Sequence, residues 1–271
     1  MSLNSAAATD YYWPVSGGQL WLPAGRPSQV KPGGTSACFR IDLPETDSAA
    51  KHWIALSDAP EWLAKEHWIS LRELLDELDS GALFWASRAL QVGHWWQRHR
   101  FCSCCGAELP APQSELLAKG ELVRICAVCH IRYYPAQTPC IIVLVTKGEY
   151  CLLAQHQRSR TGTYTALAGF VEAGERIEQT VVREVQEEVG LNVTQLTYMN
   201  SQSWPFPAQL MLGFYAHYDS GSIVPQPDEI KEAHWYHYRD LPKVPPVGTI
   251  ARQLIDGFVQ RCEMSADDKA R

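Results

Sequence analysis

The residues whose types and spacing point most directly to chemistry are the glutamates of the segment 175–191. Glu184, Glu187 and Glu188 closely follow Arg183. On a helix with about 100° between successive residues, the three carboxylates fall within an arc of about 100°. Carboxylates placed so close together repel one another and raise one another's pKa unless a cation is bound. Hard oxygen ligands of this kind predict a site for Mg²⁺ or Mn²⁺.

The same helix carries an apolar stripe beside the glutamates, formed by Val181, Val182, Val185 and Val189. This stripe predicts that one face of the helix packs against a core and that the carboxylates lie at its edge. A solvated acidic face, with Arg183 as an ordinary i,i+4 partner of Glu187, is the alternative interpretation. The upstream Gly169 and Glu175 argue against that alternative, and Gly190 is typical of a helix stop.

A second candidate site is a cluster of cysteines. Two C-x2-C motifs, separated by twenty residues, are formed by Cys102, Cys105, Cys126 and Cys129. This spacing is typical of a tetrahedral zinc site, and four thiolates leave no position for water, so the predicted zinc is structural. Cys104 competes with Cys105 as a ligand, but Gly106 favours Cys105 because it lets the backbone turn there. His130 is a less favoured substitute, and a group of redox-active or buried thiols is the remaining alternative.

A third candidate is the segment 201–209, with the sequence SQSWPFPAQ. Its prolines exclude a helix or a central strand, so we expect a stiff loop. Trp204 and Phe206 on such a loop would offer stacking surface to a flat ring at a low entropic cost. Gln202 can form hydrogen bonds with an amide or a ribose. A rigid surface loop without a ligand is the alternative.

The elements that must position these residues belong to a chain of 271 residues with a net charge of −6, 46% apolar residues and 20% charged residues. These are ordinary values for a globular protein, and the mild acidity argues against nucleic-acid binding mainly through a basic face. Nine cysteines, five of them between residues 102 and 129, do not suggest a secreted disulfide framework. Without a recognisable signal peptide or an apolar run long enough to cross a bilayer, we expect a cytoplasmic protein that does not enter a membrane.

Composition and periodicity predict three parts. Residues 1–100 contain eight of the ten tryptophans and are predicted to form an α/β domain with these side chains in its core. Residues 101–137 form the predicted zinc ribbon, and residues 138–271 form the third part. Expected helices cover 62–78, 81–98, 176–189 and 249–262. Expected strands cover 19–23, 52–56, 140–145, 150–154, 164–168, 196–200 and 210–218.

The pattern around the glutamates resembles the signature of the Nudix hydrolases, G-x5-E-x7-R-E-U-x-E-E-x-G-U with U aliphatic. The matching residues are Gly169, Glu175, Arg183, Glu184, Val185, Glu187, Glu188, Gly190 and Leu191. The resemblance implies an α+β chain in which a Nudix α/β/α sandwich over 138–271 follows the ribbon and the N-terminal α/β domain. It also implies metal-dependent cleavage of nucleoside diphosphates that are linked to another group.

By the same resemblance, Glu184, Glu187 and Glu188 are metal ligands, and one of them positions or deprotonates water. Glu175 would orient Arg183, and Arg183 would orient the helix. The segment 201–209 further resembles the S-Q-P-W-P-F-P-x-S array of the NADH pyrophosphatase, or NAD-capped RNA hydrolase, branch. The segment of this chain departs from that pattern at two positions, Ser203 and Gln209.

This branch adds the backbone oxygen of Ala168 and the side chain of Glu229 to the implied metal ligands. It implies substrate contacts at Arg72, Glu121, Tyr134, Phe170, Gln202, Ser203, Trp204, Pro205, Phe206, Pro207, Ala208, Gln209 and Ala251. The zinc ion would hold the ribbon and orient Tyr134. A homodimer is also implied.

The implied activity is hydrolysis of the pyrophosphate of NAD(H) to nicotinamide mononucleotide and AMP, with Mg²⁺ or Mn²⁺, and removal of NAD caps from RNA 5′ ends. Ser203 and Gln209 leave open a preference for ADP-ribose or a dinucleotide polyphosphate. A non-catalytic nucleotide- or RNA-binding module is a third hypothesis. Its support is limited to basic and aromatic residues of the ribbon: Lys119, Arg124, Arg132, Tyr133 and Tyr134. The complete set of glutamates argues against it, since a sensor has no need to keep all the metal ligands.

Overall fold

The computed structural model describes residues 10–29, 37–40, 51–56, 65–113, 116–117, 119–159 and 161–270. Contacts group the chain into two compact units. Unit 1 contains residues 1–136 and the loop 205–208, and unit 2 contains residues 137–204 and 209–271. The predicted zinc ribbon lies in unit 1, and the predicted domain boundary between residues 100 and 101 stays a prediction.

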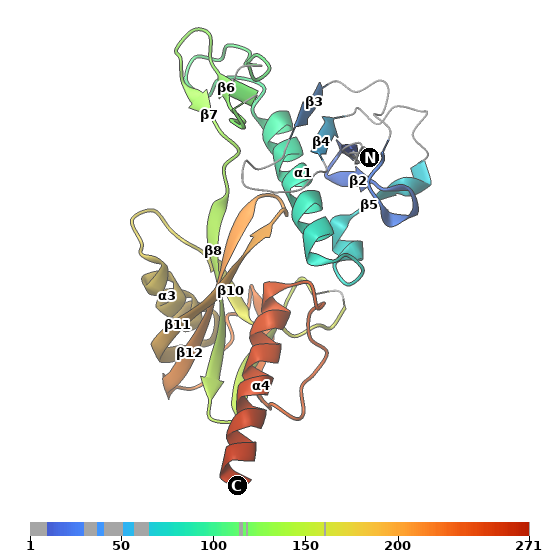
Figure 1. Ribbon diagram of the computed structural model, residues 1–271. Helices are drawn as coiled ribbons and strands as arrows, with labels where there is room; N and C mark the ends of the chain where they lie inside the picture. The colour runs from blue at the N-terminus through green and yellow to red at the C-terminus, as the bar shows by residue number, and fades with distance from the viewer. Residues whose placement is uncertain are drawn as a thin grey trace, which may run out of the picture. The chain divides into compact units, whose positions relative to one another are not determined.

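Unit 1 is built on a sheet with the strand order β3-β4-β1-β2-β5 (Figure 1). The strands are β1 (Asp10–Ser16), β2 (Gln19–Trp21), β3 (Ala37–Arg40), β4 (Lys51–Leu56) and β5 (Trp68–Ile69). β1 pairs in parallel with β4, and the other neighbouring strands are antiparallel. Helix α1 (Ser80–Arg98) follows Asp79, whose Oδ1 accepts a 2.8 Å hydrogen bond from the Ala82 N–H. Side chains of the sheet and of α1 form one core: Trp13, Leu20, Ile54, Trp85, Leu90 and Trp95. The predicted burial of tryptophans is thus confirmed for three of them.

The helix expected over 62–78 is wrong where the structure describes it, and residues 62–64 lie outside the described ranges. Residues 65–67 and 71–74 form short 3₁₀ turns on either side of β5. β5 pairs with β2, so its backbone hydrogen bonds go to the sheet rather than to a helix. Leu71 and Leu74 are still buried, because residues i and i+3 share one face in a 3₁₀ turn as in an α-helix.

The cysteine-rich part of unit 1 contains the antiparallel pair β6 (Arg124–Ile125) and β7 (Arg132–Tyr133). Arg124 is buried and attaches this part to the end of α1. Its Nε donates to the Pro110 oxygen at 2.9 Å, its Nη1 donates to the Trp96 oxygen at 3.3 Å, and its guanidinium lies 4.4 Å from the Trp96 ring. Arg124 is therefore committed to the fold and does not contribute to a basic surface.

Unit 2 contains a mixed sheet in which β11-β12-β8-β9-β13 are neighbours and β10 pairs with β8. The strands are β8 (Thr138–Lys147), β9 (Tyr150–His156), β10 (Leu167–Phe170), β11 (Leu191–Trp204), β12 (Gln209–Gly221) and β13 (Ile230–His237). β8 and β9, which contain the strands expected over 140–145 and 150–154, pair as an antiparallel hairpin. β13 is not predicted by the sequence, because a bulge between Ile230 and Glu232 breaks the two-residue alternation that marks a strand.

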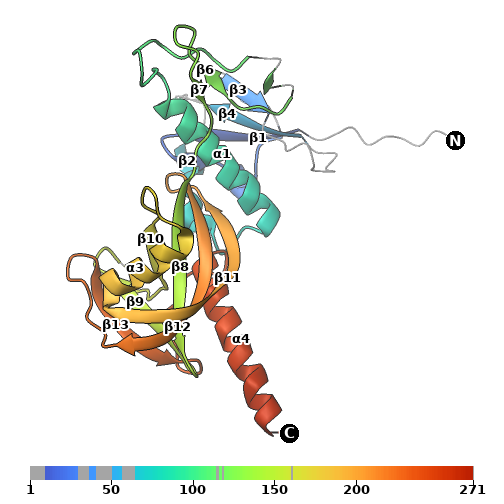
Figure 2. The same ribbon diagram turned by 90° about the vertical axis from the view of Figure 1, so that its left-hand side faces the viewer.

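Side chains of β8 alternate between the two faces of this sheet. The set that packs beneath α3 (Ile177–Val189) consists of Ile141, Val143 and Val145. The set that packs beneath α4 (Ile250–Ala270) consists of Cys140, Ile142 and Leu144. Helices on both faces give the predicted α/β/α sandwich (Figure 2) and explain why β8 is a continuous apolar run. None of the helices in the described part of the chain is long and apolar enough to cross a membrane.

Both helices of unit 2 occur where the sequence predicts them, although α4 continues to Ala270. α3 ends at Gly190, which has a φ of 72° and donates its N–H to the Gln186 oxygen at 2.9 Å. Glycine adopts this left-handed conformation without a steric penalty, so the chain can enter β11 at the next residue. Val182 is 42% exposed and is not part of the core, whereas Val181, Val185 and Val189 are fully buried.

Candidate functional site

The predicted carboxylate site lies on the side of α3 that faces β10, within unit 2. The loop 171–176 leads from β10 into α3, and reciprocal hydrogen bonds fix the first turn of the helix. The Arg176 N–H donates to Gln179 Oε1 at 3.0 Å, and the Gln179 N–H donates to the Arg176 oxygen at 2.9 Å. These bonds satisfy backbone groups that a helix start otherwise leaves unpaired. They set which side chains of α3 face β10.

Arg183 is the centre of the hydrogen-bond network on this side of α3. Its Nε and Nη2 donate to the two carboxylate oxygens of Glu175 at 2.6 and 2.9 Å. Its Nη1 donates to Glu184 Oε1 at 2.8 Å and to Glu187 Oε2 at 2.9 Å. Its Nη2 also donates to the backbone oxygen of Phe170, the last residue of β10, at 2.9 Å. One guanidinium group thus holds three carboxylates and the end of a strand in a defined arrangement.

Glu175 supports Arg183 from the loop that precedes the helix. Besides Arg183, its Oε2 accepts hydrogen bonds from Thr180 Oγ1 at 2.8 Å and from the Glu172 N–H at 3.1 Å. The hydrogen bond from Arg183, followed by those from Glu172 and Thr180, lowers the pKa of Glu175 to about 2. The carboxylate is therefore ionised across the physiological range. The contact between Glu175 and Arg183 that the motif implies is present.

Gly169 in β10 leaves the space that the Glu184 carboxylate occupies. A Cβ atom at position 169 would overlap the carboxylate carbon and both carboxylate oxygens of Glu184. Burial raises the pKa of Glu184, and its hydrogen bond with Arg183 acts in the opposite direction. The glycine of the motif is thus explained by the close approach of a side chain.

Glu188 is a deeply buried carboxylate, with 1% of its surface exposed. It takes a hydrogen bond from the backbone of Ala168, whereas its Oε2 has no partner among the residues that the structure describes. Burial, together with the negative charges of Glu184 and Glu229, raises the pKa of Glu188 to about 8. Leaving a buried carboxylate oxygen without a partner is costly, and a bound cation would remove that cost.

Two further predicted ligands lie around Glu188. The Ala168 N–H donates to the Glu188 carboxylate. In an extended strand the N–H and C=O groups of one residue point to the same side, so the Ala168 carbonyl also faces Glu188. The Gln226 N–H donates to the backbone oxygen of Glu188 at 2.9 Å, and the Glu229 N–H donates to the Gln226 oxygen at 3.2 Å. These bonds fasten the segment before β13 to the end of α3. They bring Glu229 close enough for its charge to act on Glu184 and Glu188.

This donor set fits a hard divalent cation. It comprises carboxylate oxygens and a backbone oxygen, the ligands that Mg²⁺ and Mn²⁺ prefer, and it includes the unpartnered oxygen of Glu188. The carboxylates do not form a closed cage, since among the described residues only the cysteine cluster brings its ligand atoms within 4.8 Å of one another. Glu184 and Glu187 are instead turned toward Arg183.

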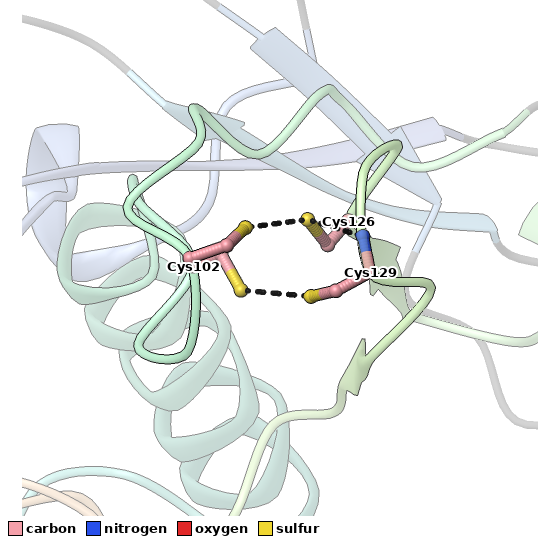
Figure 3. A group of neighbouring side chains, drawn as sticks. Cys102, Cys126 and Cys129 are labelled. Carbon is pink, nitrogen blue, oxygen red and sulfur yellow. Dashed lines mark hydrogen bonds between the residues drawn. The ribbon is translucent and has the colours of Figure 1, made fainter.

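The four predicted zinc ligands come together in unit 1. Their sulfur atoms lie within 4.8 Å of one another, and Figure 3 shows Cys102, Cys126 and Cys129 directed toward one another. The Cys102 and Cys129 sulfurs are 3.4 Å apart, and the Cys105 and Cys126 sulfurs are 3.5 Å apart. Bonds of about 2.3 Å to a tetrahedral zinc ion place ligand sulfurs about 3.8 Å apart. A small expansion of the cluster therefore accommodates zinc.

The two C-x2-C turns share one pattern of hydrogen bonds. The Gly106 N–H donates to the Cys102 oxygen at 2.9 Å, and the His130 N–H donates to the Cys126 oxygen at 3.0 Å. Gly106 and His130 both have left-handed backbones, with φ of 73° and 59°. His130 is therefore the residue that closes the second turn, and it lies outside the ligand group. Cys104 is exposed and also lies outside it.

Tyr133 supports the cysteine cluster in a way that the sequence does not indicate. Its hydroxyl oxygen lies 3.1 Å from the Cys102 sulfur and accepts the Ser103 N–H at 3.0 Å. The hydrogen bond from Tyr133 lowers the pKa of Cys102 to about 6, which favours the thiolate that binds zinc. Nothing in the spacing separates Tyr133 from its neighbour Tyr134, which is 48% exposed. Thr180, the buried partner of Glu175, has no sequence signal either.

The stiff loop expected over 201–209 is confined to residues 205–208, which form the turn between β11 and β12. The expectation is wrong for residues 201–204, which end β11, and for Gln209, which begins β12, because their backbones take part in the pairing of these two strands. Strand pairing continues as far as Trp204 and Gln209, which lie opposite each other. Gln202 Nε2 donates to the Gly248 oxygen at 2.7 Å, and Gln202 Oε1 accepts the Ile250 N–H at 2.8 Å. Both ends of the Gln202 amide thus hold the start of α4.

The tip of this turn, residues 205–208, belongs to unit 1. Phe206 packs against the core of unit 1, and the guanidinium carbon of Arg72 lies 3.9 Å from the centre of the Phe206 ring. The His94 Nδ1 lies 2.8 Å from the Pro207 oxygen. Trp204, in contrast, packs against the unit 2 core beneath α4. The two aromatic residues that the sequence places on one stacking loop therefore pack into different units.

The other predicted contact residues are distributed over both units. Glu121 in unit 1 is half-buried. In unit 2, Phe170 is 49% exposed, whereas Ala251 is buried in the first turn of α4. The Ser203 hydroxyl accepts a 3.2 Å hydrogen bond from Gln137 Nε2. Pro205 is buried and Ala208 is half-buried.

Known proteins resemble this chain, some of them over nearly its whole length and others over part of it. The NUDIX domain family model matches residues 135–258. The NAD-capped RNA hydrolase NudC of Salmonella paratyphi C (strain RKS4594) is 42% identical over 261 residues, which cover 94% of this chain and 96% of that protein. The NAD-capped RNA hydrolase NudC of Escherichia coli O1:K1 / APEC is 43% identical over 256 residues, 93% of this chain and 94% of that protein. A crystal structure of a NUDIX hydrolase from Nitrosomonas europaea matches 60% of this chain and 91% of that chain with a TM-score of 0.50 at 22% identity, a likeness of fold.

We predict that Glu188→Gln stabilises the protein at pH 8.5 in buffer without added divalent cation, by about 2–4 kcal/mol of unfolding free energy. Folding raises the pKa of the Glu188 carboxyl from about 4.5 to about 8. The unfolding free energy of the protein therefore decreases as the pH rises between these two values. Glutamine carries no charge and avoids this loss. At pH 5 the wild type and the variant should differ little. Urea unfolding followed by tryptophan fluorescence at both pH values measures the effect.

The matched control is Glu178→Gln, which removes one exposed charge from the same helix. It should shift the unfolding free energy by less than about 0.5 kcal/mol at either pH. Destabilisation by Glu188→Gln at pH 8.5 would contradict the assignment of Glu188 as a costly buried charge.

Proposed function

The chain belongs to the NUDIX hydrolase family, and on that basis we propose that it hydrolyses the pyrophosphate bond of NAD(H) to nicotinamide mononucleotide and AMP and removes NAD caps from RNA 5′ ends. The observation that carries the proposal is the cluster of three glutamates on α3. Arg183 holds Glu184 and Glu187, and the buried Oε2 of Glu188 has no hydrogen-bond partner among the described residues. The substrate class follows from the activity of relatives that are 42–43% identical over more than nine-tenths of this chain.

In this proposal Glu184, Glu188, Glu229 and the backbone oxygen of Ala168 hold Mg²⁺ or Mn²⁺. Such an ion, when bound, polarises the diphosphate and lowers the pKa of water. The residues of the chain have separate tasks around it. Arg183 and Glu175 keep α3 in register with β10, and Gly169 keeps room for the carboxylate of Glu184.

Glu187 is the carboxylate of the helix that we assign to the attacking water. Its side chain is 54% exposed, in contrast to those of its neighbours Glu184 and Glu188. Arg183 holds one of its oxygens, Oε2, at 2.9 Å. The other oxygen can then accept a hydrogen bond from water and receive its proton.

The aromatic residues supply the proposed contacts with the substrate rings. Tyr134 and Phe170 present exposed rings. Trp204 is the last residue of β11, and Phe206 lies in the turn that follows it. We assign Gln202 an indirect role, because its amide holds the start of α4, where Ala251 lies. The remaining assigned contacts are Arg72, Glu121, Ser203, Pro205, Pro207, Ala208 and Gln209.

The cysteine cluster is assigned a structural zinc ion with no part in the reaction. The fit of four convergent sulfurs to a tetrahedral ion supports this assignment. The proposal also includes a homodimer in the cytoplasm, and light scattering coupled to size-exclusion chromatography tests the dimer.

Product identification tests the activity. The protein is incubated with NADH, NAD⁺, ADP-ribose or NAD-capped RNA in the presence of Mg²⁺ or Mn²⁺. NADH and NAD-capped RNA should be cleaved with release of nicotinamide mononucleotide or its reduced form. Glu188→Gln should lower kcat by about 10²–10⁴-fold while Glu178→Gln retains activity. Strong turnover of ADP-ribose with negligible cleavage of NADH would refute the proposed substrate, and tight nucleotide binding without turnover would favour a sensor.

We predict that Gly169→Ala lowers the affinity of the protein for the catalytic metal without unfolding the protein. The new methyl group displaces the Glu184 carboxylate, which is the flexible end of a side chain and can move. The concentration of Mn²⁺ that gives half-maximal rate should rise by about tenfold or more, the effect expected when a metal ligand loses its position, with little change in Tm.

A double-mutant cycle tests whether Gly169→Ala acts by displacing the Glu184 carboxylate. In a Glu184→Ala background, Gly169→Ala should have no further effect, because the displaced group is gone. Additive losses in the double variant would show that Gly169 acts by another route.

We predict that Cys126→Ser loses zinc and lowers Tm, whereas Cys104→Ser retains both zinc and stability. Cys126 is buried in the ligand group and Cys104 is exposed outside it. Zinc binding contributes folding free energy, so loss of one thiolate weakens the whole cluster. Metal analysis of the purified variants is the measurement, and an unchanged zinc content in Cys126→Ser would overturn the four-cysteine assignment.

A further inference from the structure

Two pairs of an arginine and an exposed aromatic ring lie beside the cysteine cluster in unit 1. Phe101 is 56% exposed, and the guanidinium carbon of Arg100 lies 5.7 Å from the centre of its ring. Tyr134 is 48% exposed, and Arg132 Nη1 donates to its hydroxyl oxygen at 3.3 Å. Arg124, the remaining arginine of β6 and β7, is buried and committed to the fold.

The cysteine cluster holds the two pairs close to each other. Phe101 directly precedes Cys102, whereas Tyr133 lies between Arg132 and Tyr134. The hydroxyl oxygen of Tyr133 is 3.1 Å from the Cys102 sulfur. Because consecutive Cα atoms are about 3.8 Å apart, a contact between these neighbours keeps both pairs on one small region. Val128 and Ile131 are exposed on the second C-x2-C turn of the same region, by 67% and 39%.

The positive charges of the two arginines in this region are available to a ligand. Neither Arg100 nor Arg132 forms an ion pair with any residue that the structure describes. Glu121 is the acidic residue whose charge acts on Arg132, without an ion pair. Exposed apolar surface combined with unpaired cations is uncommon on a monomer unless a partner covers it.

We propose that this region binds the single-stranded RNA chain that follows the NAD cap. The ribbon surface is defined as Arg100, Phe101, Val128, Ile131 and Arg132, with Tyr134 at its border. The proposal rests on the proposed function, in which Tyr134 contacts a ring of the cap. The ribbon surface then extends the cap site along the RNA.

The chemistry of the ribbon surface matches single-stranded RNA. Aromatic rings stack on unpaired bases of any sequence, and guanidinium groups contact the phosphates between them. Each ring–cation pair combines the two kinds of contact that a nucleotide offers, a base to stack on and a phosphate to bind. Glu108, opposite Phe101, and Glu121, near Arg132, lie in the same region, so the arginines act through individual phosphate contacts rather than through a net positive field.

Binding of RNA without a cap tests the ribbon surface directly. The probe is a 5′-hydroxyl single-stranded RNA of mixed sequence, about 20 nucleotides long, with a fluorophore at its 3′ end. The protein is the full chain with zinc bound, and fluorescence anisotropy gives Kd. Phe101→Ala should raise Kd about fivefold or more through lost stacking. Arg100→Gln should raise Kd and reduce the slope of log Kd against log salt by about one.

The matched control is Arg239→Gln. Arg239 also lies over an aromatic ring, 5.1 Å from the centre of Tyr238, but in unit 2. The Arg239→Gln variant loses the same charge as Arg100→Gln and should leave the Kd for the RNA unchanged. Circular dichroism and zinc content confirm that each variant is folded. Arg100 is exposed, so Arg100→Gln remains informative if Phe101→Ala disturbs the ribbon.

Activity measurements connect the ribbon surface to the reaction. The Arg100→Gln, Phe101→Ala double variant should keep kcat/KM for NADH within about twofold and lose about tenfold or more for NAD-capped RNA, through KM. Equal Kd for uncapped RNA in the wild type and the double variant would overturn the proposal. A change of oligomeric state in the double variant, with RNA binding intact, would identify a protein interface and also overturn it. Weakened RNA binding in a protein that cleaves no NADH would support the ribbon surface while refuting the proposed function.

Discussion

The candidate site in unit 2 depends on keeping three carboxylates together against a sheet although their charges repel one another. A single guanidinium, that of Arg183, makes this possible, because its donors reach Glu175, Glu184 and Glu187 at once. A lysine could not replace it, since an ammonium group has no planar fork of donors. Glu188 accepts none of these bonds, and its Oε2 has no hydrogen-bond partner in the described part of the chain. Arg183 therefore offsets only part of the negative charge of the site, and the remaining charge together with the Glu188 oxygen favours the binding of a cation.

Unit 1 depends on a different constraint, the closure of the cysteine cluster. Four sulfurs within 4.8 Å of one another bring two separate turns together without a large core. The hydrophobic cluster around them is small, with Cys102, Leu109 and Cys126 as its buried members. Arg124 then joins this part to the end of α1 through backbone oxygens. Loss of the cluster would remove the support on which Tyr134 and the ribbon surface rest.

Much of this arrangement could be predicted from the sequence, because it depends on local spacing. The periodicity of Val181, Val185 and Val189 predicts α3, and the glycine after it predicts its end. The spacing of two C-x2-C motifs predicts which sulfurs meet. Features that depend on tertiary contacts could not be predicted in this way. The segment 65–74 has helical spacing, but Trp68 and Ile69 pair with β2 and the residues on either side form 3₁₀ turns. Gln202 suggests a ligand contact, yet it holds the start of α4. Tyr133 and Thr180 have no motif that distinguishes them.

The two turns of the cysteine cluster make the same hydrogen bonds with different residues at the left-handed position. Glycine at 106 adopts its φ of 73° freely, whereas histidine at 130 adopts 59° with a side chain, at a cost of about 1 kcal/mol. The two halves of the cluster are thus unequal although their geometry is alike. The half formed by Cys126 and Cys129 stores the strain, so local opening should begin there when the cluster is challenged by a chelator or an oxidant. A residue that is not itself a ligand thus makes one half of the cluster costlier to hold in place than the other.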